Sequence, residues 1–118
     1  MAITTDGRES IAVVLGASGT TPTHFAIGSG DTAFNITDTA LAKEYDRNEI
    51  TTTDLSVGQN TTFVGNFSST EISGTVFREF GMLNNAAGGN LYHREVLIGS
   101  LSFEGDRELQ LQTTYKVT

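Results

Sequence analysis

The sequence predicts an all-β protein: a single antiparallel β-sandwich or jelly-roll-like barrel of about seven strands, with one short helix. Three observations carry this prediction. Threonine, a β-branched residue that favours strands, occurs 18 times in 118 residues. Short segments of alternating apolar and polar residues recur along the chain, and turn residues separate them. The last of these segments, residues 108–117, alternates most regularly, which predicts one buried and one solvated face.

The strands are expected in the following order. The apolar run Ile11–Leu15 forms a first strand, and residues 23–27 form a second one between Pro22 and Gly28. The other strands are expected within residues 47–57, 61–67, 76–84, 91–98 and 108–117. Gly88 and Gly89 can adopt positive φ, so the segments 76–84 and 91–98 are expected to form a hairpin. Residues 68–74 are expected as a polar loop, and residues 99–107 as a connection with a turn at 104–106.

The only helix signal is short. Asp38 can cap the N-terminus of a segment from Thr39 to Tyr45, in which Leu41 and Tyr45 lie four positions apart on one helix face. This pattern supports one to two helical turns.

Composition limits the function classes. The chain has no cysteine and carries 14 acidic against 7 basic residues, a net charge of −7, which argues against nucleic-acid backbones and anionic membranes as partners. No window approaches the ~18 apolar residues of a membrane span, and the first residues lack the pattern of a secretory signal. We expect one domain over residues 1–118, with residues 1–21 as a docking arm or a first strand.

An acidic surface with only two lysines, Lys43 and Lys116, is also typical of proteins adapted to high salt. Dense carboxylates hold water, and salt screens their repulsion. We therefore hypothesise a halophilic protein.

Three candidate sites have simpler explanations. The segment Gly28-Ser-Gly30 with Ala33 fits a loose dinucleotide-binding pattern, but no helix start follows it, which favours a turn. His24 and His93 lie in strand-like segments, where a structural histidine is the commoner case. The acidic residues between Asp31 and Glu49 could supply oxygen ligands for Ca²⁺, but their spacing matches no EF-hand loop. We expect no enzymatic activity, and we assign no catalytic, cofactor-binding or metal-binding residue.

Three charged residues, Arg47, Glu79 and Arg94, fall within expected strands. They could pair inside the sandwich or at a subunit interface, and strand alternation equally allows each of them to point to solvent.

Two stretches together resemble small all-β structural proteins of tailed viruses. The first matches a pattern G-x-G-x-T followed by D-T-x-L-x-x-E-x-x-R, and the second a hairpin pattern E-x-G-hydrophobic-hydrophobic-N followed by G-G-x-L-x-x-R. The matching residues are Gly28, Gly30, Asp38, Thr39, Leu41, Glu44 and Arg47 in the first stretch, and Glu79, Gly81, Asn84 and Arg94 in the second. The segment Phe34-Asn-Ile-Thr37 departs from the family's Pro/Ala-rich spacer, and residues 1–21 have no counterpart in it.

The resemblance implies a non-enzymatic component of the virion, located on the capsid as a decoration or turret protein, or on the tail as a fibre or baseplate component. Its partners would be capsid or tail proteins and further copies of itself. Threonine-rich, lysine-poor strand edges favour a cyclic homo-oligomer, from trimer to hexamer. The alternative is a carbohydrate-binding or adhesin module that recognises a host-surface glycan, although the chain has no Trp. A small hydrolase is a third hypothesis.

Overall fold

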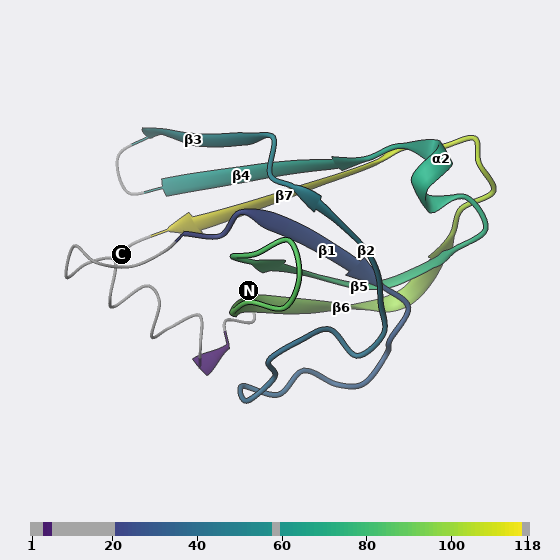
Figure 1. The fold of residues 1–118 in the computed structure, drawn as a ribbon, viewed down its shortest axis with the longest axis horizontal. Coiled ribbons are helices and arrows are strands. Elements are labelled where there is room, and N and C mark those ends of the chain that lie inside the picture. The colour runs from purple at the N-terminus through teal and green to yellow at the C-terminus, as the bar shows by residue number, and fades with distance from the viewer. Residues whose placement is uncertain (1–3, 6–20, 58–59, 117–118) are drawn as a thin grey trace.

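The computed structural model describes residues 4–5, 21–57 and 60–116. The named elements in chain order are β1 (His24–Gly28), β2 (Glu44–Glu49), β3 (Thr52–Val57), β4 (Asn60–Phe67), α2 (Ser69–Ile72), β5 (Val76–Leu83), β6 (Leu91–Ser102) and β7 (Leu109–Lys116). The strands form two antiparallel sheets, in the orders β2-β1-β5-β6 and β3-β4-β7, which lie one above the other (Figure 1). The predicted sandwich of seven strands with one short helix is confirmed, but the sheets do not close into a barrel.

The core lies between the two sheets and is rich in aromatic residues. Its buried members are Phe25, Ile27, Phe63, Phe67, Ile72, Phe77, Met82, Tyr92, Phe103 and Leu111. The predicted alternation of the last strand is confirmed. Leu111 and Thr113 are buried, whereas Gln110, Gln112 and Thr114 are exposed. Burial of one face therefore holds β7 in its register on β4.

The expected hairpin is confirmed. Strands β5 and β6 pair antiparallel, and both Gly88 and Gly89 have positive φ in the connection. Gly105 also has positive φ in the expected turn at 104–106. The expectation that residues 99–107 form a connection was wrong in part, because β6 continues to Ser102.

The single strand expected within residues 47–57 was also wrong. The structure has two strands there, with Ile50 and Thr51 between β2 and β3. β2 belongs to the four-stranded sheet and β3 to the three-stranded sheet, so this short connection carries the chain from one sheet to the other (Figure 1).

The helix was predicted at the wrong position in the chain. Residues 39–43 belong to the loop between β1 and β2, and Glu44 and Tyr45 begin β2. The helix is α2, within the segment expected as a polar loop. The Ser68 hydroxyl accepts from the Glu71 amide, and the Ser68 amide donates to the Glu71 carboxylate, which completes a capping box.

The loop of residues 29–43, here called the β1–β2 loop, covers the face of the four-stranded sheet that points away from the three-stranded sheet (Figure 1). A second, smaller apolar cluster lies there and consists of Ala26, Leu41, Leu83 and Leu91. The loop supplies Leu41, which is why this segment packs on the sheet instead of forming a helix.

The expected strand Ile11–Leu15 lies outside the described residues. Of the proposed arm 1–21, the structure describes Thr4, Thr5 and Thr21. Thr4 is buried, and its amide donates to the Tyr92 carbonyl at the start of β6 (2.9 Å). No helix in the described part of the chain is long and apolar enough to cross a membrane.

Candidate functional site

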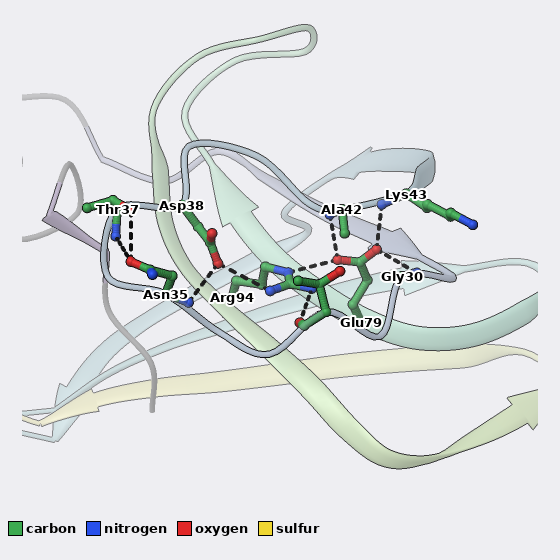
Figure 2. Close-up of polar contacts among 9 residues, drawn as sticks. Gly30, Asn35, Thr37, Asp38, Ala42, Lys43, Glu79 and Arg94 are labelled. Carbon is green, nitrogen blue, oxygen red and sulfur yellow. Dashed lines mark hydrogen bonds and ion pairs between the residues drawn. The ribbon is translucent and has the colours of Figure 1, made fainter.

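A buried carboxylate, Glu79 of β5, lies beneath the β1–β2 loop. Its side chain is completely buried. The Gly30 amide donates to Oε2 (2.7 Å), the Lys43 amide also donates to Oε2 (2.8 Å), and the Ala42 amide donates to Oε1 (2.8 Å). One carboxylate therefore joins the beginning and the end of the loop, as Figure 2 shows.

Arg94 of β6 neutralises this carboxylate. Its Nε donates to Glu79 Oε1 at 2.8 Å, and its side chain is almost fully buried. The remaining guanidinium nitrogens reach the loop: Nη1 pairs with Asp38 Oδ2 (3.2 Å), and Nη2 donates to the Thr32 carbonyl (2.8 Å). Arg94 thus links the sheet to the middle of the same loop (Figure 2).

The pKa of Glu79 is the balance of opposing effects. Burial by itself would raise it, because the charged form loses its hydration. Hydrogen bonds from Arg94 and from the Lys43, Ala42 and Gly30 amides stabilise the ionised form, and the pKa is lowered overall. The Glu79 carboxylate therefore remains ionised at neutral pH.

Two glycines allow the backbone of the β1–β2 loop to lie close to the Glu79 carboxylate and to itself. A Cβ placed on Gly28 would lie 2.4 Å from the Lys43 carbonyl oxygen, and one placed on Gly30 would lie 2.4 Å from Glu79 Oε2. The Gly-x-Gly spacing thus allows the loop to pack closely on an internal carboxylate. Gly28 ends β1, and residues 29–33 that follow are irregular loop without a helix start.

A second ion pair joins β2 to the β5–β6 hairpin. Arg47 makes a two-point contact with Glu44, at 2.7 and 2.6 Å. Its Nη1 also donates to the carbonyl oxygens of Asn85 and Gly88 (2.9 and 2.8 Å). The guanidinium thereby holds the hairpin connection against β2.

The other motif residues have packing or turn roles, with one exception. Gly81 lies opposite Arg94, and a Cβ there would lie 2.5 Å from the His93 carbonyl oxygen and 3.2 Å from Leu41 Cδ2. Asn84 Oδ1 accepts from the Asn90 amide (2.8 Å) and so closes the hairpin connection. Thr39 is exposed in the loop and belongs to neither ion-pair cluster.

Arg47, Glu79 and Arg94 thus all form ion pairs within the protomer. Glu79 and Arg94 pair with each other, but beneath the β1–β2 loop and not in the core between the sheets. Sequence reasoning missed the Ala42 and Lys43 amides and the Thr32 carbonyl, because backbone groups leave no residue-type signal. The capping pattern Ser68-x-x-Glu71, in contrast, was present in the sequence and could have located α2.

The two histidines are far from a catalytic arrangement in the described residues. His24 Nδ1 bonds the Thr23 hydroxyl (2.7 Å). His93 is completely buried, its Nδ1 bonds the Tyr115 hydroxyl (3.1 Å), and its Nε2 has no partner. Burial lowers the pKa of His93 to about 4, so its ring is neutral at pH 7.

The acidic residues of the region 31–49 do not converge on a cation site. Among the described residues, no group of three or more His, Asp or Glu side chains could hold a metal ion. Asp38 and Glu44 instead pair with Arg94 and Arg47.

Surface hollows occur in the described part of the molecule. One, of about 530 Å³, lies beside His24, Glu49, Ile50 and the hairpin residues Asn84 and Asn85. Another, of about 280 Å³, lies between β6 and β7 and is lined by Phe80, Val96 and Leu97 together with Thr113. Most of the residues that line the first are polar, and none of them is Phe, Tyr or Trp.

Comparison of the chain with protein-family models found no match, and comparison with curated proteins found none either.

Proposed function

We propose that this protein is a non-enzymatic structural component of a tailed-virus particle, located on the capsid as a decoration or turret protein or on the tail as an accessory protein. It acts as a homo-oligomer, cyclic from trimer to hexamer, that contacts other capsid or tail proteins. The proposal rests on the resemblance of the sequence motifs and on the roles that the motif residues have in the fold.

The observation that carries the proposal is how Glu79 and Arg94 use their polar groups. Both side chains are buried, and their hydrogen bonds all go to the protein's own loop and to each other. A catalytic carboxylate needs access to substrate, whereas a structural one needs satisfied hydrogen bonds in a dry site. The motif thus maintains a rigid loop, which suits a protein whose function is to present surfaces to neighbours.

The adhesin alternative gains less support. Sugars commonly stack on exposed aromatic side chains. All ten Phe and Tyr residues of the chain lie in the described part, and none of them is exposed. A host glycan would therefore have to bind through polar groups alone, for example in the hollow beside His24.

Immunogold labelling of intact particles tests the proposal. Antibodies raised against the purified chain are expected to label the capsid or the tail of particles from cells that carry the gene. Particles assembled after deletion of the gene serve as the control and should lose the label. Unlabelled wild-type particles, with the protein detected only in the host lysate, would overturn the proposal.

A further inference from the structure

One edge of the sandwich carries an unusual apolar projection. Phe77 and Glu79 of β5 pair with Leu101 and Val96 of β6, so the single residue Arg78 stands opposite residues 97–100. The extra residues form a large bulge on an edge strand. We call residues 97–100 the β6 bulge. Its tip is apolar: Ile98 is fully exposed, and Leu97 and the adjoining Leu101 are also exposed.

Among residues 4–5, 21–57 and 60–116, no strand lies beyond β6 in the sheet order. Thr4 bonds the beginning of this edge, at Leu91 and Tyr92. The segment Val96–Ser102 contains no charged residue and no proline. Exposed edges of monomeric proteins normally carry Lys, Pro or other charges that prevent pairing. Uncharged apolar residues on such an edge indicate a surface that another molecule covers.

A groove that can receive an apolar side chain lies next to the bulge. Phe80, Val96 and Leu97 form its apolar wall on the four-stranded sheet. Glu95 adds a carboxylate on the same sheet, and Thr113 with its neighbours lines the β7 side. Its volume, about 280 Å³, is below the range of roughly 300–1,000 Å³ that is usual for small-molecule pockets. It is better suited to protein side chains than to a separate ligand.

The bulge and the groove lie side by side on the same edge of one chain. This arrangement favours a second copy of the chain as the molecule that fills the groove. In a two-fold dimer each patch contacts its own copy, so neighbouring projections and hollows can fill each other reciprocally. A head-to-tail ring would need the projection and the hollow on opposite sides of the protomer. Charge favours the same partner. Two copies that each carry −7 repel each other, and the uncharged segment Val96–Ser102 lets them approach with least repulsion.

We propose that the β6 bulge and the adjacent groove form a two-fold interface between two copies of this chain, in which Ile98 of each copy enters the groove of the other. The inference does not depend on the proposed function. Strands β2 and β3, at the opposite edges of the two sheets, remain available for ring contacts or for other particle proteins.

The first test is the mass of the purified chain by light scattering and sedimentation, at low and at molar KCl. The wild type is expected to form a concentration-dependent dimer. Ile98→Glu places a like charge at the interface and should weaken dimerisation by at least about tenfold. Ile36→Glu is the matched control, because Ile36 is an exposed large apolar residue of the described chain that lies away from the β6 bulge, in the β1–β2 loop. It should dimerise like the wild type.

Because Ile98 is fully exposed in the protomer, Ile98→Glu should keep the wild-type unfolding midpoint when both proteins are measured at a concentration at which they are monomeric. A monomeric wild type at high concentration would overturn the proposal, as would a dimer or ring that Ile98→Glu leaves intact. Equal weakening by the two variants would also overturn it, since the effect would then be one of net charge.

A crosslinking experiment tests the geometry independently. The chain has no cysteine, so a single introduced cysteine can form only an intermolecular disulfide. Gly99→Cys is well suited, because a Cβ at Gly99 meets nothing within 4 Å. Mild oxidation should crosslink Gly99→Cys into a covalent dimer, whereas Thr39→Cys in the exposed loop should not crosslink at the same concentration. Equal crosslinking of the two would count against a specific interface at the β6 bulge.

Discussion

At the scale of single residues, Glu79 and Arg94 determine how the β1–β2 loop is held. Each is buried, and Arg94 is the ion-pair partner of Glu79, whereas Arg94 has Asp38 as a second, more exposed partner. Such a pair adds little to stability compared with apolar residues, but the loss of one partner leaves an uncompensated buried charge. What the pair provides is specificity, because its hydrogen bonds reach Gly30, Ala42 and Lys43 only in this loop conformation.

Glu79→Gln is therefore expected to lower the free energy of unfolding by about 3–5 kcal/mol, because the buried Arg94 then keeps only the more exposed Asp38 as a counter-charge. Urea denaturation measures this change. Glu108→Gln is the control, because Glu108 is exposed, and its effect should stay within about 0.5 kcal/mol. Equal midpoints for the two variants would show that the Glu79–Arg94 pair does not support the fold.

His93 makes the stability depend on pH. Its native pKa of about 4 lies below the ordinary value of 6.5, so the unfolded chain binds its proton more readily than the native protein. The contribution is present above pH 6.5 and is lost as the pH falls from 6.5 towards 4. The difference corresponds to roughly 3 kcal/mol. Glu79 also contributes stability that depends on pH. Because its pKa is lowered from 4.5, that contribution is lost only below pH 4.5, and the loss due to His93 can be measured separately above this pH.

The free energy of unfolding, measured by urea denaturation at several pH values, should therefore fall between pH 6.5 and 4.5. His93→Phe should flatten this slope whatever its effect on absolute stability. His24→Gln, in a half-buried position, should retain it. A wild-type slope that survives in His93→Phe would contradict the assignment.

At the scale of elements, close approach of backbones decides where glycine is required. Gly81 of β5 and Gly99 of the β6 bulge are both strand glycines without positive φ. A Cβ on Gly81 would meet the His93 carbonyl oxygen at 2.5 Å, whereas a Cβ on Gly99 would meet nothing within 4 Å. Substitution of either glycine by alanine therefore tests a crowded position at Gly81 and an open position at Gly99.

Gly81→Ala is expected to destabilise the protein by about 1–3 kcal/mol, because the clash is with backbone and the sheet must shift to relieve it. Gly99→Ala should change the free energy of unfolding by less than about 0.5 kcal/mol. Thermal and urea unfolding of both variants measure the difference. Similar losses at the two positions would mean that the strand glycines matter for flexibility and not for space.

At the scale of the whole molecule, the net charge of −7 opposes compactness. Local carboxylates show the same crowding. Burial raises the pKa of Asp46, and the neighbouring carboxylates of Glu71 and Glu44 add to the rise. Salt should relieve this repulsion, since the screening length falls from about 10 Å at 0.1 M to about 3 Å at 1 M.

The thermal unfolding midpoint is therefore expected to rise as KCl is increased from low to molar concentration. A triple variant, Asp31→Asn with Glu104→Gln and Glu108→Gln, changes three exposed acids and brings the net charge from −7 to −7 + 3 = −4. Its midpoint should depend less on salt. A wild-type midpoint that does not change with KCl would contradict the hypothesis of adaptation to high salt.

The sequence by itself determined the all-β class, the β5–β6 hairpin and the face of β7 that is buried. These features depend on local signals: residue alternation, glycine pairs and β-branched residues. Only the tertiary structure decided that residues 39–43 form a loop and that Glu79 pairs with Arg94 beneath it. The helix signal at Asp38 was real but weak. It was outweighed by the burial of Leu41 and by the hydrogen bonds that the Ala42 and Lys43 amides donate to the Glu79 carboxylate, 37 and 36 positions further along the chain. Long-range contacts of this kind leave no local pattern, because the partners meet only after the sheet has formed.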